Sequence, residues 1–227
     1  EAAKILNDSG MSKSVTISFQ SMNEKTNHAI NRKNITNEEF NTMVDFYNKE
    51  KIPIYSEIIC GLPEETLESF KNGLNEAIRG GNQLFVYTCS VLPNTEMCTA
   101  SYKKLYGIKT IRSKVTPVHC SPLDVDEFEE IIVTTNTMPI EDFKKALIYS
   151  WQKQLEYSFG CKVTDDINQF FNERCKELLS GNGRCVLIDN IYYEPEEAAY
   201  LKWFCDDTGN KIEKVNYARK NGTLKEK

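Results

Sequence analysis

No apolar segment of this 227-residue sequence approaches the roughly 20 residues that a helix needs to cross a bilayer. The first residues also lack the basic-then-apolar pattern of a secretory signal peptide. Both absences predict a soluble globular protein of the cytoplasm, with no membrane partner.

A basic stripe is absent as well. The formal net charge is −5, and the basic tail from Lys211 to Lys227 is interrupted by Glu213 and Glu226. Proteins that bind phosphate backbones concentrate Lys and Arg on one surface. The composition therefore predicts no nucleic-acid partner and a solvated tail.

The eight cysteines lack the close spacing of metal-binding motifs. No two of them stand in a C-x2-C or C-x3-C arrangement, so the sequence carries no local motif for zinc or an iron–sulfur cluster. Cys60 and Cys89 fall in apolar runs, where we expect small core residues. His119-Cys120 and His28 are weak candidates for an acid–base or ligand role, because an isolated histidine in a polar segment is more often solvated.

A regular alternation of strand and helix patterns is present, and 40% hydrophobic residues are enough for the core of one domain plus an appendage. Runs of apolar and β-branched residues at 14–20, 54–60 and 84–92 predict strands. Between them, Thr36 and Glu39 form a capping box before an amphipathic helix, and a helical period returns at 67–78. This βαβαβ order predicts an α/β fold with a parallel sheet or part of a (β/α) barrel.

The rest of the sequence divides less clearly. Residues 98–126 show no period, which predicts a lid or an excursion across a barrel mouth. A further strand is expected at 129–135, and helices are expected at 141–159, at 165–179 and from Pro195 to Cys205. We therefore predict three parts: residues 1–97 with three strands, 98–140 as the lid with one extra strand, and 141–227 as a helical region.

The stretch from Tyr55 to Thr66 is the most informative. It is a strand that stops at Gly61, followed by Pro63 and an acidic turn into a helix. Glu57 is unusual there, because a carboxylate inside an apolar strand is costly to bury without a partner. Ligands gather at the carboxyl ends of strands in α/β proteins, so Glu57 is either a ligand contact or a glutamate on an exposed edge.

Three stretches occur together in a recognisable order: Ile17–Met22 followed by Arg32-Lys33-Asn34, then Ser56–Phe70, then Val91–Met97. Together they resemble the second half of a radical S-adenosylmethionine (SAM) barrel, and most nearly its cobalamin-binding (B12-binding) branch. In that branch a strand of the type E-I-V-x-x-T and a helical region follow, as 130–135 and 142–151 would here. The resemblance covers residues 1–155 and implies the second half of a partial (β/α)6 TIM-type barrel with a mainly helical C-terminal region.

The resemblance also implies roles for individual residues. Gln20 would hydrogen-bond a ribose hydroxyl of SAM, Arg32 would pair with its carboxylate, and Glu57 would share the ribose. An Arg fork matches a carboxylate bidentately, so the residue types suit these tasks. The adenine would lie against a second group: the Ile59 side chain and the main chain of Gly61 and of the Leu92-Pro93 turn. Weaker candidates, for substrate contact, are Tyr87, Cys89 and Glu96.

One departure from the family concerns the metal. The family holds a [4Fe–4S] cluster through C-x3-C-x2-C after the first barrel strand. That motif, the first three strands and a cobalamin-binding domain have no counterpart in this sequence. We interpret the sequence as the C-terminal portion of such an enzyme, inactive by itself, and assign no catalytic residue.

The expected function is that of the complete enzyme. It would bind SAM and a [4Fe–4S] cluster, receive electrons from a donor such as flavodoxin or ferredoxin, and generate a 5′-deoxyadenosyl radical that abstracts hydrogen from a small-molecule substrate. With cobalamin, the expected outcome is methyl transfer to an unactivated carbon, and a ring closure or rearrangement is the alternative. Two other functions stay open: a non-catalytic barrel remnant that binds a nucleotide or a partner protein, and a non-radical enzyme with Glu57 as general base.

Overall fold

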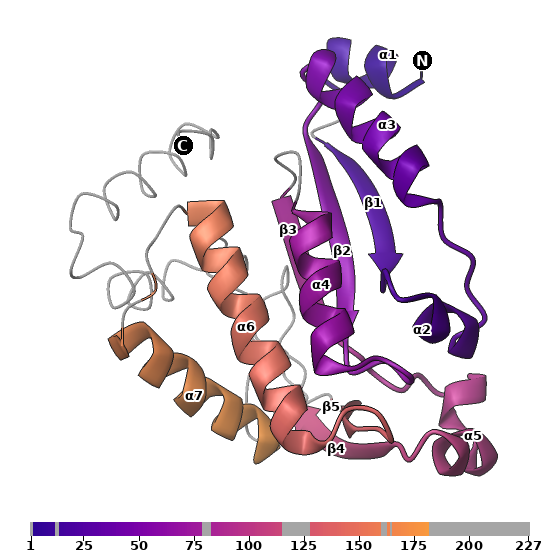
Figure 1. The fold of residues 1–227 in the computed structure, drawn as a ribbon, viewed down its shortest axis with the longest axis vertical. Coiled ribbons are helices and arrows are strands. Elements are labelled where there is room, and N and C mark those ends of the chain that lie inside the picture. Colours follow the sequence, from indigo (N-terminus) through magenta and orange to yellow (C-terminus); the bar gives the residue numbers. More distant parts are fainter. Residues whose placement is uncertain are drawn as a thin grey trace. The chain divides into compact units, whose positions relative to one another are not determined.

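The structure is a computed structural model that describes residues 2–11, 14–78, 83–114, 128–159, 163 and 165–181 (Figure 1). The chain divides into two compact units. The first is formed by residues 1–111 and 130–150, and the second takes the described residues among 112–129 and 151–181. The predicted boundaries at 97 and 140 stay predictions.

The first unit is built on a parallel sheet of three strands in the order β1-β2-β3. The strands are β1 (Val15–Gln20), β2 (Ile54–Cys60) and β3 (Gln83–Thr88), and β2 lies in the centre. Helices α2 (Glu24–Ala29) and α3 (Asn37–Lys49) connect β1 to β2, and α4 (Leu67–Ala77) connects β2 to β3. The predicted α/β class with a parallel sheet is confirmed.

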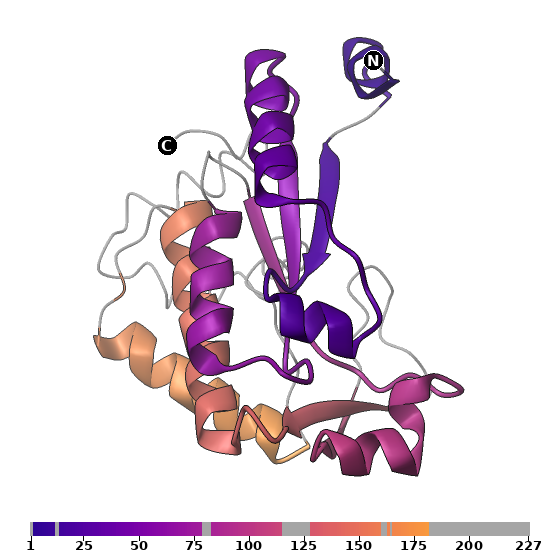
Figure 2. The same cartoon turned by 45° about the vertical axis from the view of Figure 1, so that its right-hand side comes forward.

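Burial alternates strictly along β2, so the sheet has two distinct faces. Figures 1 and 2 show α3 and α4 on one face. There Phe40 and Val44 of α3 pack with Ile17, Phe19 and Ile54, and the rings of Phe19 and Phe40 lie 4.7 Å apart, edge to face. The opposite face carries the half-buried side chains of the strands, including Ser18, Glu57 and Ile59.

The helix termini follow from local sequence. Thr36 and Glu39 form the predicted capping box of α3, with a distance of 3.1 Å from Glu39 N to Thr36 Oγ1. Thr66 and Ser69 form an equivalent pair at the start of α4. The first helix, α1 (Ala2–Asp8), ends before Gly10, whose φ of +69° is the left-handed conformation expected of a glycine stop.

The third strand is shorter than its apolar run. Regular pairing with β2 ends at Thr88, and the chain from Cys89 to Val91 then turns to β5 (Phe128–Thr134). Val91 N donates to Glu130 O at 2.8 Å and Ile132 N donates to Cys89 O at 2.9 Å, around an antiparallel bridge between Ser90 and Ile131. The strand predicted at 129–135 is therefore confirmed, as β5.

The expectation of irregular structure at 98–126 is wrong for its first part. After a single turn of 3-10 helix (Glu96–Cys98), the chain forms α5 (Ala100–Leu105) and β4 (Lys109–Lys114), which pairs with β5. Each of these elements has only six residues. For α5 this is less than two helical turns, so the sequence shows no helical period there. Residues 115–127 lie outside the described part.

Both helices predicted in the C-terminal region are found, as α6 (Ile140–Phe159) and α7 (Asp165–Leu179). In the second unit, the rings of Trp151 and Phe171 lie 5.6 Å apart, and Gln152 Nε2 donates to Asn168 Oδ1 at 2.6 Å. The helix expected from Pro195 to Cys205 lies outside the described residues. Within the described ranges, no helix combines the length and the apolar character that a membrane crossing requires.

Candidate functional site

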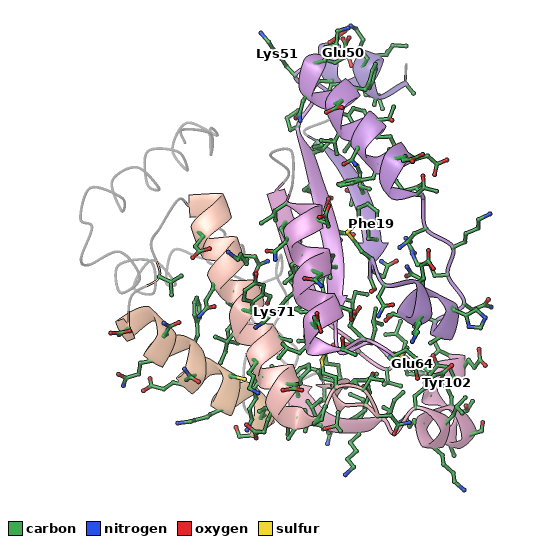
Figure 3. The ribbon with its side chains drawn as sticks, viewed as in Figure 1. Phe19, Glu50, Lys51, Glu64, Lys71 and Tyr102 are labelled. Atoms are coloured by element: carbon green, nitrogen blue, oxygen red, sulfur yellow. The ribbon has the colours of Figure 1, made fainter. Side chains whose placement is uncertain are left out.

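Residues at and near the carboxyl ends of β1 and β2 form the candidate site. Figure 3 labels three residues that locate it: Phe19 on β1, Glu64 in the loop after β2, and Tyr102 on α5. Glu57 and Ile59 lie on the face of the sheet opposite to the buried side chains of Ile17 and Ile58, whereas Gln20 ends β1 and Arg32 reaches this strand from the segment between α2 and α3. The carboxyl ends of the strands and the loops that follow them are where a parallel α/β sheet binds ligands.

Gln20 ends β1 in an unusual conformation. The pairing of β1 with β2 slips after Ser18, so that Gln20 rather than Phe19 is opposite Ile58, and Gln20 has a φ of +58°. Its side-chain Oε1 is buried and accepts no hydrogen bond from any described residue. A buried acceptor without a donor is unfavourable, so this atom is a specific candidate for contact with a ligand hydroxyl.

Glu57 is half-buried on the central strand, so the alternative of a glutamate on a sheet edge does not hold. Its carboxylate accepts a hydrogen bond from the hydroxyl of Ser18, its register partner on β1. A carboxylate can accept from several donors, which leaves Glu57 with capacity for a further one.

Arg32 lies in the exposed segment between α2 and α3, and its side chain returns to β1. A terminal guanidinium nitrogen donates to Ser18 O, and Nε donates to Asn34 Oδ1 at 2.7 Å. In the described part of the chain the guanidinium forms no ion pair with a carboxylate. Gln20, Arg32 and Glu57 thus lie around Ser18. Glu57 contacts the Ser18 hydroxyl, Arg32 contacts the Ser18 carbonyl, and Gln20 follows Ser18 by two residues on the same strand.

The end of α2, which precedes Arg32, is fixed from α5. The hydroxyl of Tyr102 donates to Ala29 O at 2.8 Å, and Ile30 packs against the same hydrophobic cluster as Tyr102. Burial, with smaller contributions from neighbouring acidic groups, raises the pKa of Tyr102 to about 12. The hydroxyl keeps its proton at neutral pH. As a donor to Ala29 O it holds the end of α2, which precedes the Arg32 segment, in place.

Ile59 and Gly61 belong to a second group of predicted residues. Ile59 is half-buried against the cluster that contains Leu62 and Cys89. Gly61 has a φ of +95°, and a Cβ there would lie 3.0 Å from Ile132 O. Only glycine fits this approach of the loop to β5.

Leu92 and Pro93 form the exposed start of the turn after Val91, with Leu92 61% exposed. Thr95 closes that turn by donating from its hydroxyl to Leu92 O at 2.7 Å. Within the part of the chain that the structure describes, no hydrogen bond joins this turn to Gln20, Arg32 or Glu57. The structure therefore brings Gln20, Arg32 and Glu57 together and leaves the Leu92-Pro93 turn as a separate, exposed feature.

Sequence reasoning missed a buried acid, Glu65, which is 1% exposed. Its carboxylate accepts hydrogen bonds from the hydroxyls of Ser21, next to Gln20, and Ser69, in the first turn of α4. Burial raises the pKa of the Glu65 carboxyl above its ordinary 4.5, although these hydrogen bonds oppose the shift. Glu65 thereby joins the end of β1 to the start of α4.

Of the weaker candidates for substrate contact, Tyr87 on β3 lies opposite Ile59 on β2, whereas Cys89 and Glu96 follow the end of that pairing. Cys89 is buried, burial raises the pKa of its thiol to about 12, and its Sγ lies 3.8 Å from Met97 Sδ. Cys60 is also buried, so the prediction that both are core residues is confirmed. Tyr87, Glu96 and His28 are exposed, and His119-Cys120 lies outside the described residues. Among the residues that the structure describes, no group of three or more His, Cys, Asp or Glu is arranged to hold a metal ion.

No protein-family profile matches the chain. Two curated proteins do match it. The cobalamin-dependent radical SAM methyltransferase TokK of Streptomyces tokunonensis is 32% identical over 164 residues, which are 71% of this chain and 24% of that protein. A 2-(S-pantetheinyl)-carbapenam-3-carboxylate methyltransferase of Streptantibioticus cattleyicolor is 30% identical over 146 residues, 63% of this chain and 21% of that protein.

The chain thus spans less than a quarter of the length of these relatives. The identity extends over most of the chain, which is far more than one short motif, and it agrees with the resemblance inferred from three separate stretches. This chain is therefore related to the cobalamin-dependent branch of the radical SAM enzymes.

Proposed function

We propose that this chain forms the SAM-binding part of a cobalamin-dependent radical SAM methyltransferase, built as the second half of a (β/α)6 TIM-type barrel. At the level of the family, both relatives are methyltransferases by name. The observation that supports the proposal is the position of Gln20, Arg32 and Glu57 around Ser18, near the carboxyl end of β1.

The donors and acceptors of this group fit SAM. The vicinal ribose hydroxyls of SAM can donate to the buried Gln20 Oε1 and to the Glu57 carboxylate. The methionine carboxylate can accept from Arg32, whose guanidinium has five N–H donors and uses two of its nitrogens within the chain. In this role the protein binds and orients SAM by one positive and two accepting groups.

The adenine would lie beside the apolar residues of the second group. Ile59 offers a half-buried side chain on the same face of β2 as Glu57. The main chain at Gly61 and the exposed turn at Leu92 and Pro93 would edge the base. Tyr87 is the exposed residue that we propose for substrate contact.

The [4Fe–4S] cluster needs ligands that the described residues do not offer, so no step of the reaction is assigned through it here. When bound, the cluster, SAM and cobalamin supply hydrogen abstraction from an unactivated carbon and the methyl group. A small-molecule substrate and an electron donor such as flavodoxin or ferredoxin complete the proposal. The residues of this chain bind SAM and fix its orientation.

The test uses the full-length protein, reconstituted without oxygen with iron, sulfide and cobalamin. We would incubate it with SAM and a chemical reductant and quantify 5′-deoxyadenosine and S-adenosylhomocysteine. The Arg32→Ala variant is compared with Lys33→Ala, which removes a neighbouring exposed cation outside the site.

Both products are expected, and Arg32→Ala should lose most of each whereas Lys33→Ala should retain them. SAM binding without cleavage would favour the non-catalytic binding remnant. Failure of the reconstituted protein to bind SAM would overturn the proposal.

A further inference from the structure

Asn34 has side-chain contacts that no part of the proposed SAM site accounts for. Its Nδ2 donates to Phe19 O at 2.8 Å and to Ser21 O at 2.7 Å. These two carbonyls belong to the residues on either side of Gln20. The Oδ1 atom of the same amide accepts from Arg32 Nε at 2.7 Å.

The orientation of this amide follows from its partners. The two carbonyls can only accept, so they need the NH2 group, and the Arg32 Nε–H can only donate, so it needs the oxygen. A carboxamide is the small side chain that has two donors and an acceptor on one rigid plane. We call these three hydrogen bonds the Asn34 bridge.

Gln20 needs such support, because its backbone is in a sparsely populated conformation. A φ of +58° is uncommon for a residue with a Cβ, and it occurs where the pairing of β1 with β2 has slipped. Such conformations persist only where surrounding contacts fix them. Asn27 adds a fourth hydrogen bond, from Nδ2 to Ser21 O at 3.0 Å.

The other end of the bridge restrains Arg32. This arginine is exposed, so its long side chain would otherwise sample several rotamers. With Nε on Asn34 and a terminal nitrogen on Ser18 O, the guanidinium is fixed beside the end of β1. A cation fixed in this way loses less entropy when it binds a carboxylate.

We propose that Asn34 is a positioning residue that sets Gln20 and Arg32 in one geometry for SAM. The inference rests on the proposed function and adds to it a residue that does not itself touch SAM. The contacts of Gln20 and Arg32 with SAM then depend on each other. The Asn34 amide holds both the backbone on either side of Gln20 and the side chain of Arg32.

The test measures SAM affinity by calorimetry in the full-length, cluster-loaded protein. Asn34→Asp keeps the shape and the acceptor for Arg32 but faces two carbonyls with an oxygen. Asn34→Ala removes the bridge without adding a charge, and Lys33→Ala is the matched control on the same exposed segment. Thermal unfolding confirms that each variant is folded. Hydrogen exchange in the SAM-free protein follows the amides from Phe19 to Asn23.

We expect about 10-fold weaker SAM binding for both Asn34 variants, the scale of one net hydrogen bond, and faster exchange near Ser21. The control Lys33→Ala should change neither the SAM affinity nor the exchange rates. In a Gln20→Ala, Arg32→Ala background, Asn34→Ala should change the affinity less than about two-fold, since the residues through which it acts are already absent.

The outcomes separate this inference from the proposed function. If the wild-type protein does not bind SAM, the proposed function fails. If it binds SAM and the Asn34 variants bind equally well, the positioning role is wrong. A loss that is the same in the wild-type and doubly substituted backgrounds would also overturn it, because it would show a general structural role. If neither variant folds, the smaller change Asn34→Ser is measured under mild denaturant. It should exchange faster at 19–23 than the Lys33→Ala control, and equal exchange leads to the same rejection.

Discussion

The hydroxyl of Ser18 on β1 donates a hydrogen bond to the carboxylate of Glu57, which is directly opposite on β2. In a parallel sheet, side chains of paired residues point to the same face, and this pair lies on the face opposite to the one that packs against α3. A half-buried carboxylate thus has a donor within the sheet. The carbonyl of the same Ser18 accepts a hydrogen bond from Arg32, so one serine contacts two of the residues that are predicted to bind SAM.

Replacing Ser18 by Ala should therefore lower the free energy of unfolding. The Glu57 carboxylate would lose its donor while still half-buried, which costs about 1 to 2 kcal/mol. Urea denaturation measures the change, and Thr16→Ala on the exposed end of the same strand is the control. Adding Glu57→Gln to Ser18→Ala should recover part of the loss, since the partly desolvated charge is then gone. Equal losses for Ser18→Ala and Thr16→Ala would show that the pair contributes nothing specific.

Arg32→Ala should weaken SAM binding of the full-length enzyme by about 1.5 to 3 kcal/mol, the scale of a hydrogen bond to a charged group. Arg32→Lys should recover only a fraction, because an ammonium keeps the charge but lacks the planar fork that binds Asn34 and a carboxylate together. Titration calorimetry on both variants measures the two losses. An unchanged affinity in Arg32→Ala would remove this residue from the site.

Much of the fold was predictable because local and tertiary preferences agree. The run Ile54–Cys60 is apolar at every buried position of a central strand except Ser56, and the Thr36–Glu39 capping box forms as its sequence predicts. Prediction failed where an element is too short to display a period, as in α5. It also failed at Thr88, because continuous apolar residues do not indicate that the chain exchanges β2 for β5 as its pairing partner.

The candidate site was predictable only in part. Gln20, Arg32 and Glu57 were named from a family pattern, and the structure brings them together, but whether they bind SAM stays a prediction. Asn34 was quoted in the motif without a role, because its contacts depend on the slipped register at Gln20, which no local pattern encodes. Glu65 was taken as an ordinary acid before a helix, where acids are common for electrostatic reasons. Its burial depends on Ser21, 44 residues earlier.

Stability should depend on pH through Glu65. Its folded-state pKa is raised above 4.5, chiefly by burial, so the folded protein binds this proton more tightly than the unfolded chain does. The contribution of the protonated group is then complete below pH 4.5 and is lost as the pH rises through the higher folded-state value. Glu65→Gln should consequently gain stability relative to wild type as the pH increases above 4.5.

Chemical denaturation of both proteins at several pH values measures this difference. Glu68→Gln, at an exposed position of the first turn of α4, is the control and should follow wild type in this range. The hydroxyl groups of Ser21 and Ser69 can rotate, so each can accept from the amide of a Gln side chain as well as donate to it. A difference between Glu65→Gln and wild type that stays constant across the range would contradict the raised pKa.

The loop after β2 should tolerate no side chain at Gly61. A Cβ there would lie 3.0 Å from Ile132 O and 3.3 Å from Phe143 Cε2, and the φ of +95° is strained for any other residue. Gly61→Ala combines both penalties and should destabilise by about 2 to 4 kcal/mol. Gly10→Ala is the matched control, because Gly10 has a φ of +69° with nothing within 4 Å of its Cβ position. It should cost only about 1 kcal/mol of backbone strain. Similar losses in urea denaturation of the two variants would show that the close approach to β5 does not constrain this loop.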